Sequence, residues 1–367
     1  MKINSFDLDI CSVNIISQGG GYGESIVIHL GNRDFIVIDS CVDKKTGKAL
    51  PLLFLEENNI DFSRVKRIIC THWHKDHING MPQIVEKCQD ADFVFARANN
   101  KKKFYDFVTL DSENKERFEN STTSDFVKCL DSLSNKARRW RASYDQILYS
   151  DVYKSQRIAI SALSPSEKVN EDYEIELSGL IDQASKSDIR TPLLSPNDKS
   201  VVLLIEIGYH NVLLGADLEV KDNDLYGWLN ITRYSNIVNG ANKSTYFKIP
   251  HHGSENGFHQ EIWDKLLEKD PIASITPYSK SSLPKQDMLH KYHNLTKSLH
   301  LTSSPKKFNR PKKRDSQITK AILRFNPTVK ELRKSLGIVS HTIDITAKNA
   351  EWKSQHIGEA FEISLAS

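Results

Sequence analysis

The sequence contains few cysteines and no long apolar segment. Its five cysteines are an odd number among 367 residues, and no two of them have the CxxC spacing that is typical of zinc knuckles. This favours reduced thiols in a cytosolic protein over a disulfide framework. No apolar run approaches the ~20 residues that cross a bilayer, and the first residues lack the apolar core of a secretory signal peptide. We therefore expect a cytoplasmic protein without a membrane partner.

An excess of charge of one sign is also lacking. The chain has 50 Lys and Arg against 47 Asp and Glu, a net charge of +3, which on its own does not indicate a nucleic-acid binder. Hydrophobic residues make up 39% of the sequence, which excludes wholesale disorder. At about 100–200 residues per domain, the length allows one large domain or two moderate ones.

Local patterns divide the chain into strand-rich parts and one contrasting segment. Runs of β-branched residues predict strands at 25–30, 35–38 and 65–70. Residues 99–153 differ, because they are rich in charged and polar residues and contain neither glycine nor proline. We predict a helical insertion there. Strands resume at 157–163, and the weak alternation of the last fifty or so residues can complete the fold.

Four potential metal ligands follow one of these predicted strands directly. Residues 71–80 read THWHKDHING. His72 and His74 are two positions apart in an extended segment, so their side chains can point the same way. Asp76 and His77 can turn toward a neighbouring point from the same loop. Imidazoles and carboxylates are ligands of Zn²⁺ and similar divalent ions, so this spacing predicts a metal site at the end of the strand.

Through this HxHxDH motif the sequence resembles the metallo-β-lactamase superfamily. Asp39, in FIVIDS, matches the early aspartate that steadies the metal loop in this family. Asp217, in LLGADL, matches the carboxylate that bridges two metals, and His251 and His252, in PHHGS, match the family's late histidine. The resemblance implies an α/β fold, namely a four-layer αββα sandwich, with the helical insertion on one rim.

From about Asp7 to about Ser304, the sequence looks most like the hydrolase domain of the DNA-uptake competence channel. A GxGES segment near the start, an NxxS segment before a strand and a KxPHHGS segment carry this resemblance, which covers the catalytic domain only. We expect one hydrolase domain over 1–305, and a basic segment with a C-terminal extension over 306–367 that packs on it. The residues expected to support the ligands or to contact substrate are Asp39, Ser164, Asn197, Ser200 and Ser254.

The resemblance also implies a ligand set for one or two divalent ions, Zn²⁺ with Mn²⁺ as an alternative. The residues that would hold these ions are His72, His74, Asp76, His77, Asp217 and one of the paired histidines, His251 and His252. We favour His252, the residue before the glycine, and both histidines stay candidates.

One histidine of the family pattern is missing. No histidine lies between His77 and His210, and Ser164 stands where relatives carry a histidine before a proline. His210 is not expected to replace it, because the predicted hairpin puts it about 20 Å from the metal end of its strand. Three alternatives stay open. In the first, the ligands of the first ion are completed by water beside Ser164 or by the Glu167 carboxylate. Otherwise one ion binds firmly and the other weakly, or catalysis has been lost.

The resemblance implies hydrolysis by a metal-activated hydroxide. We predict Asp76, His252 and Lys248 as catalytic residues, and Lys248, His251 and His259 are the candidates for the acid that protonates the leaving group. A phosphodiesterase or nuclease is the leading hypothesis. The alternatives are a hydrolase of a small ester, thioester, lactone or amide, and a catalytically degenerate protein with a binding or regulatory role.

Local basic clusters favour a nucleic acid or nucleotide substrate over the other classes. Arg138, Arg139 and Arg141 surround Trp140, so this cluster can neutralise phosphates and stack a base. The alternative for each basic run is a solvated face or a mobile loop. A second cluster near the C-terminus consists of Lys306, Lys307, Arg310, Lys312, Lys313 and Arg314.

Overall fold

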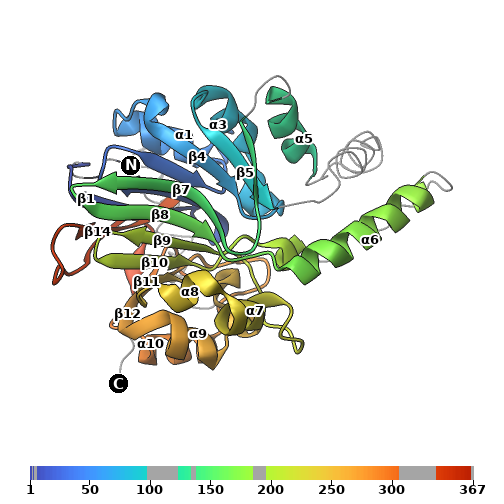
Figure 1. Cartoon of the computed structure of the whole chain (residues 1–367). Coiled ribbons are helices and arrows are strands. Elements are labelled where there is room, and N and C mark those ends of the chain that lie inside the picture. Colours follow the sequence, from blue (N-terminus) through green and yellow to red (C-terminus); the bar gives the residue numbers. More distant parts are fainter. Residues whose placement is uncertain are drawn as a thin grey trace, which may run out of the picture.

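A computed structural model describes residues 1, 3, 6–96, 123–133, 138–184, 196–305 and 336–364, which form two eight-stranded sheets (Figure 1). The first sheet has the order β15-β14-β1-β2-β3-β4-β5-β6. Its strands are β1 (Ile10–Gln18), β2 (Tyr22–Leu30), β3 (Phe35–Ile38), β4 (Val65–Cys70), β5 (Asp92–Ala96), β6 (Arg139–Ala142), β14 (Leu336–Asp344) and β15 (Lys353–Gly358). The second sheet has the order β16-β13-β12-β11-β10-β9-β8-β7. Its strands are β7 (Gln146–Tyr153), β8 (Gln156–Ala162), β9 (Leu203–Ile207), β10 (His210–Leu214), β11 (Ser244–Lys248), β12 (Leu267–Ile275), β13 (Ser298–Leu301) and β16 (Phe361–Glu362).

Helices cover the outer face of each sheet. Figure 1 shows α1, α3 and α5 on the first sheet and α7, α9 and α10 on the second. One apolar cluster joins the first set of helices to its sheet, and another joins the second set. The predicted αββα sandwich is therefore confirmed. None of the described helices is both long and apolar enough to cross a membrane. The helices are α1 (Leu50–Glu57), α2 (Lys75–Ile78), α3 (Met81–Lys87), α5 (Thr123–Ser132), α6 (Glu167–Ala184), α7 (Gly227–Tyr234), α8 (Asn236–Gly240), α9 (Gln260–Leu266) and α10 (Gln286–Asn294).

A third apolar cluster lies between the two sheets, and strand β2 shows how the sequence builds it. Ile26 and Ile28 face the second sheet, whereas Val27 faces the helices. Both faces of the strand are buried, so its sequence is an almost continuous apolar run. Glu24 has the same parity as Ile26 and therefore also points between the sheets. There it meets Lys248 of β11, with 2.7 Å between Nζ and Oε2 and both side chains buried.

The prediction of a helical insertion over 99–153 is wrong for its second half. Within that segment the described residues form helix α5 and then two strands, β6 and β7, which are the edge strands of the two sheets. Leu148 on β7 is buried while Ile147 and Val152 are exposed, so the strand has one buried and one solvated face. β-branched and aromatic residues suit such a half-buried edge strand, and this preference outweighs the polar composition that suggested helix.

The C-terminal part completes both sheets. β14 pairs antiparallel with β1 along nine residues, and β16 pairs with β13 at the edge of the second sheet. The basic residues predicted over 306–314 lie outside the described residues.

Candidate metal centre

The loop after β4 is held in shape by one buried carboxylate. Asp39 follows β3, and its Oδ1 accepts a hydrogen bond from the Thr71 backbone N–H (2.8 Å). Its Oδ2 accepts a hydrogen bond from the Thr71 hydroxyl (2.6 Å) and lies 2.8 Å from Nδ1 of His77. Burial raises the pKa of the Asp39 carboxyl, although His77 opposes this shift. Asp39 thus fixes the start of the loop and turns Nε2 of His77 inward.

The second sheet supplies the opposite side of the site from the ends of β10 and β11. Gly215 lies so close to the chain after β11 that an added Cβ would be 2.8 Å from Cβ of Pro250. Glycine therefore lets Asp217 approach the short helix η4 (His251–Gly253). The His252 ring is buried, and its Nδ1 lies 2.8 Å from the Thr276 carbonyl oxygen, which leaves Nε2 facing Asp217.

Asp217 lies at the centre of the assembled cluster. Its Oδ2 is 3.7 Å from Nε2 of His72, 3.5 Å from Nε2 of His77 and 3.5 Å from Nε2 of His252. Asp76 adds a second carboxylate, with Oδ2 3.3 Å from Nε2 of His252.

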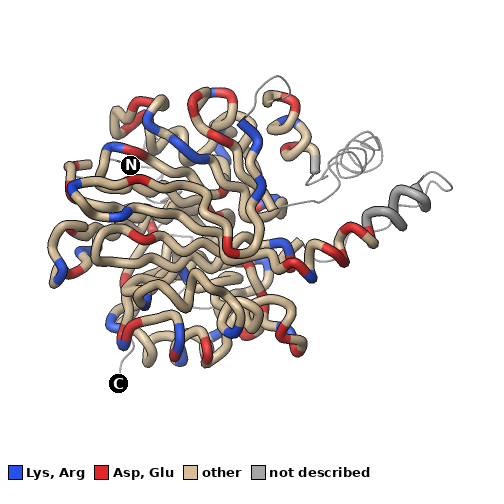
Figure 2. Tube along the Cα trace, viewed as in Figure 1, with Lys and Arg blue, Asp and Glu red and all other residues tan. Residues whose placement is uncertain are grey.

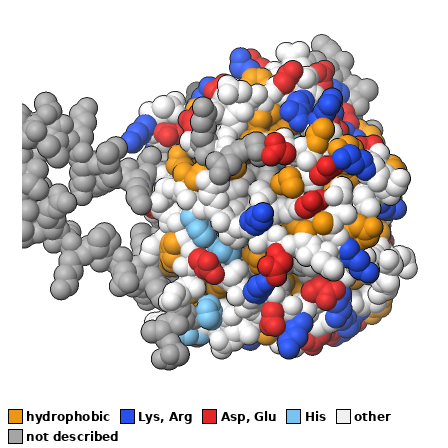
Figure 3. All heavy atoms as spheres, turned by 90° about the vertical axis from the view of Figure 1, so that its left-hand side faces the viewer, with side chains coloured by type: hydrophobic (Ala, Val, Ile, Leu, Met, Phe, Trp, Pro, Cys, Tyr) orange, Lys and Arg blue, Asp and Glu red, His pale blue; other side chains and the backbone are white. Residues whose placement is uncertain are grey.

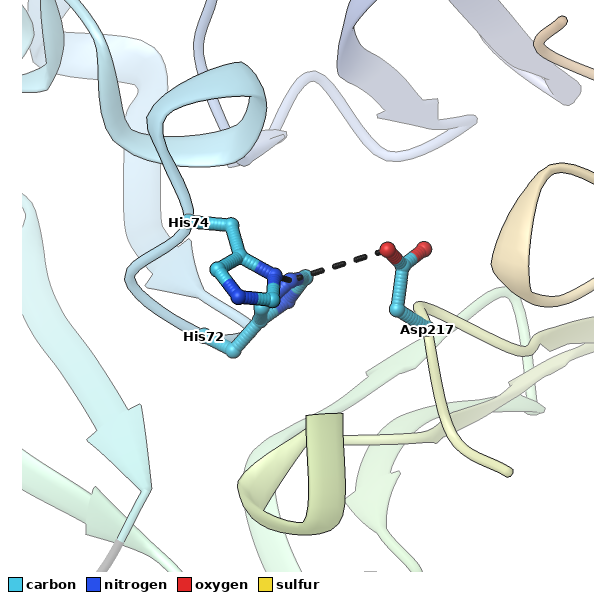
Figure 4. A group of neighbouring side chains, drawn as sticks. All are labelled: His72, His74 and Asp217. Carbon is cyan, nitrogen blue, oxygen red and sulfur yellow. Dashed lines mark hydrogen bonds and ion pairs between the residues drawn. The ribbon is translucent and has the colours of Figure 1, made fainter. Parts of the chain in front are cut away.

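Two groups of potential ligand atoms lie around Asp217, each with all atoms within 4.8 Å of one another. The first group contains His72, His74 and Asp217, which Figure 4 shows converging from the two sides of the site. The second group contains Asp76, His77 and His252. A third such group, Glu24, Asp39 and His77, shares His77, but its two carboxylates already bind Lys248 and Thr71.

The hydrogen bonding of these residues also fits a bound divalent metal. Among the described residues, neither Nε2 of His77 nor Oδ1 of Asp217 makes a hydrogen bond, although both atoms are buried. Both residues belong to the groups of potential ligands, so a cation bound there would satisfy atoms that the protein leaves unpaired. His77 and His252 each direct Nδ1 at a protein oxygen, as metal-binding histidines typically do.

The electrostatics of the cluster agree with this assignment. Burial lowers the pKa of His72 well below its usual range, and His77 adds to the effect, so the His72 ring is neutral, the form in which an imidazole can bind a metal. Burial opposes the charge of Asp217, but His252 and His77 outweigh it and hold the Asp217 pKa well below its usual value. Burial likewise opposes the charge of His77, yet Asp217 and Asp39 raise its pKa well above the usual value. A bound cation would replace the protons on these imidazoles.

Comparison with known proteins gives the family. The family model of the metallo-β-lactamase superfamily matches residues 19–257. The chain belongs to the metallo-β-lactamase superfamily. No curated protein matches this superfamily member.

Solved structures with the metallo-β-lactamase fold are similar to the chain at low identity. The metallo-β-lactamase fold protein YhfI from Bacillus subtilis is 11% identical, with a TM-score of 0.40, and the match covers 81% of this chain and 97% of that one. The metallo-β-lactamase SMB-1 bound to 2-mercaptoethanesulfonate is 12% identical, with a TM-score of 0.30, and the match covers 57% of this chain and 67% of that one. A putative metallo-β-lactamase from Thermotoga maritima is 13% identical, with a TM-score of 0.30, and the match covers 56% of this chain and 78% of that one.

A cavity of about 290 Å³ opens over the metal centre of this metallo-β-lactamase fold. Its lining residues are Tyr22, His74, Lys75, Asp76, Asn197, Asp217, His251, His252, Tyr278, Lys280, Ser281 and Leu283. Sequence reasoning missed Tyr22, Tyr278 and Lys280, because Tyr22 begins β2 whereas the other two follow β12, far away in the chain. The one available signal was the glycine-rich turn before Tyr22.

His251 takes a different place from His252. It lines the cavity but belongs to neither group of ligand atoms. Its Nδ1 is 3.0 Å from Oδ1 of Asn256, and its Nε2 is 3.4 Å from the Asn197 amide nitrogen. The Ser254 hydroxyl donates to the same Asn256 oxygen, so Asn197 and Ser254 lie around His251.

The structure places Lys248 away from the cavity, which does not support its predicted catalytic role. Its ammonium group is fully buried, pairs with Glu24 and donates to the Ile249 carbonyl oxygen (3.0 Å). A leaving-group acid must contact the substrate, and Lys248 does not line the cavity. His259 caps helix α9 by accepting a hydrogen bond from the Glu261 N–H and does not line the cavity either. Of the three candidate acids, His251 alone lies there.

Ser164 takes a structural role at the position of the missing histidine. Its hydroxyl donates to the Ser200 carbonyl oxygen (2.6 Å) and accepts from the Val202 N–H (2.8 Å), and the side chain is buried. Neither Ser164 nor Glu167 belongs to a group of ligand atoms among the described residues. His210 lies at the start of β10, where Nε2 is 3.0 Å from the Ala347 carbonyl oxygen, away from the site as expected.

The arginine cluster predicted for nucleic-acid contact does not reach the cavity. The Arg138 guanidinium donates to the carbonyl oxygens of Ala91 and Cys88, and that of Arg139 donates to the Leu130 carbonyl oxygen. Neither these residues nor Arg141 lines the cavity. Basic and acidic residues are dispersed over the described trace (Figure 2), and side chains of both signs are intermixed on the face in Figure 3.

Replacement of Asp39 tests the support of the ligands. In the wild type, both oxygens of Asp39 accept hydrogen bonds. Asp39→Asn replaces one of them with an amide nitrogen, which cannot accept, so His77 loses its fixed orientation. We expect affinity for Zn²⁺ to fall about 10- to 100-fold in competition with a chromophoric chelator. Asp90→Asn, an exposed aspartate, is the matched control. Unchanged affinity in Asp39→Asn would contradict the role given to this carboxylate.

Replacement of Ser164 separates a structural role from a ligand role. Ser164→Ala leaves the buried Val202 N–H without its partner, so the free energy of unfolding should fall by about 1–3 kcal/mol in a urea titration. Zn²⁺ affinity should stay within twofold or so of the wild type, and the exposed control Ser150→Ala should change neither quantity. A large loss of metal affinity at unchanged stability would instead put Ser164 among the ligands.

Proposed function

We propose that this superfamily member is a metal-dependent phosphodiesterase that acts on nucleic acid or nucleotides. The observation that carries the proposal is the lining of the cavity over the two ligand groups. Lys75 and Lys280 are exposed at its mouth, and the remaining lining is mostly polar or aromatic. Cations beside a metal centre suit a substrate that carries negative charge at and next to the bond to be broken. The sequence likeness to the DNA-uptake hydrolase domain supports the same substrate class.

The chemistry divides between the ions and the chain. Zn²⁺ or Mn²⁺ held by the two groups would act as a Lewis acid on the phosphoryl oxygens and would acidify a water molecule. Asp76 lies at the wall of the cavity, and its pKa is held below the usual range, because hydrogen bonding to His252 and the charge of His77 outweigh burial. An ionised Asp76 can orient the attacking water, as well as bind metal. The lysines at the mouth would hold the phosphodiester in place.

Hydrolysis of a small ester, thioester or lactone is the second enzymatic candidate. An apolar funnel would favour it, but Leu283 is the one aliphatic side chain among the described residues that line the cavity. A degenerate binding protein is the third candidate, since the family's third histidine is absent. Against it, each group still offers three ligands, the number typical of catalytic zinc sites.

An activity panel tests this proposal. The protein, supplied with Mn²⁺ or Zn²⁺, should hydrolyse bis-p-nitrophenyl phosphate and at least one of single-stranded DNA, double-stranded DNA and RNA. Asp217→Ala removes a ligand that lies between both groups, so kcat/KM should fall at least about 100-fold. The exposed control Asp222→Ala should keep wild-type activity. Turnover of a thioester or lactone with none of the phosphodiesters would overturn the proposal, and so would inactivity of the metal-loaded protein on every substrate.

A further inference from the structure

Two loops that are far apart in the sequence are fixed to each other at the mouth of the cavity. Ser279 lies after β12, and its N–H donates to the Gly21 carbonyl oxygen (2.7 Å), while its hydroxyl donates to the Gly20 carbonyl oxygen. Gly21 has a φ of +70°, and an added Cβ would lie 2.6 Å from Oγ of Ser279. Glycine is therefore required for this contact. The glycine-rich turn thus positions the residue that follows it, Tyr22.

The paired loops build an aromatic row that leads to the metal centre. The Tyr278 ring stacks on the His252 ring, with centroids 4.8 Å apart and an angle of 18° between the planes. Tyr22 stacks beside Tyr278, with centroids 6.1 Å apart and an angle of 28°. Both tyrosines are partly buried and line the cavity. The row therefore extends from a candidate metal ligand to the rim.

Two lysines lie against the outer end of this row. Nζ of Lys280 is 4.8 Å from the centre of the Tyr22 ring, and Nζ of Lys44 is 5.5 Å from it. Both lysines are exposed, and neither forms an ion pair within the described part of the chain. Lysine side chains are long and flexible, so their ammonium groups can leave the ring to meet an anion. The face of Tyr22 would then be open to a planar group.

We infer that Tyr22, Tyr278 and Lys280 form a subsite for one nucleoside unit and its phosphate beside the bond that is hydrolysed. Aromatic faces bind nucleobases without regard to sequence, and neighbouring lysines bind the backbone phosphates. The cavity of about 290 Å³ lies at the lower end of the range for small-molecule sites, so it takes an unstacked nucleotide and not a duplex. The inference rests on the proposed phosphodiesterase function and specifies single-stranded substrate.

Two esters that share a leaving group test the subsite in the full-length protein. The p-nitrophenyl ester of thymidine 5′-phosphate carries a nucleoside, and methyl p-nitrophenyl phosphate does not. The wild type should prefer the nucleoside ester, and Tyr22→Ala should reduce the ratio of the two kcat/KM values about 5- to 150-fold. Tyr209→Ala is the matched control, because Tyr209 is exposed at the β9–β10 turn, and it should keep the wild-type ratio.

Binding without turnover provides the second readout. With EDTA present, fluorescence anisotropy of labelled oligothymidylate should show tighter binding of the single strand than of a duplex. Lys280→Ala should reduce the slope of log Kd against log salt concentration by about 0.7, the value for one phosphate contact in a single strand. Lys269→Ala, at the other end of β12, should leave the slope unchanged.

The outcomes separate this inference from the proposed function. If neither these esters nor the phosphodiesters of the activity panel are hydrolysed but binding depends on Tyr22 and Lys280, the phosphodiesterase function is wrong and the nucleotide-binding subsite stands. If both esters are hydrolysed equally well and the variants change neither the ratio nor the binding, the subsite is wrong and the function stands. Tighter binding of duplex than of single strand would also overturn the subsite.

Discussion

The contact between the Asp217 carboxylate and three imidazole rings is the interaction on which the site depends. Asp217 and His252 come from the second sheet, whereas His72 and His77 come from the loop after β4 of the first sheet. Neither sheet can form the ligand groups alone. The packing of the two sheets is therefore a condition for metal binding, and a bound cation would in turn hold the sheet edges together. Fold and site stabilise each other in this arrangement.

Other buried polar groups keep the two sides in register. Asp39 fixes the loop after β4 through its contacts with Thr71 and His77. The ion pair of Glu24 with Lys248 crosses the space between the sheets. A buried charge without its partner is costly, so this pair constrains how the sheets face each other. Such groups lie outside the cavity, yet they decide whether the ligands converge.

Much of the site could be predicted because its ligands lie in short motifs at strand ends. The HxHxDH loop, Asp39 and Asp217 each follow a recognisable strand, and the packing of strand ends brings them together. Lys248 does not line the cavity, because the alternation that places Tyr246 between the sheets also places Lys248 there. Tyr22 and Tyr278 could not be paired from the sequence, since tertiary contacts alone join their loops. Residues 139–153 form strands instead of the predicted helix, because alternation along a half-buried edge strand outweighs polar composition.

Anomalous diffraction from crystals grown with Zn²⁺ would locate the bound ions. We expect two peaks about 3.5–4 Å apart, as in two-metal hydrolases. One peak should lie at His72, His74 and Asp217, and the other at Asp76, His77 and His252, with Asp217 beside both. Zinc bound elsewhere, with no peak within ligand distance of Asp217, would contradict this assignment.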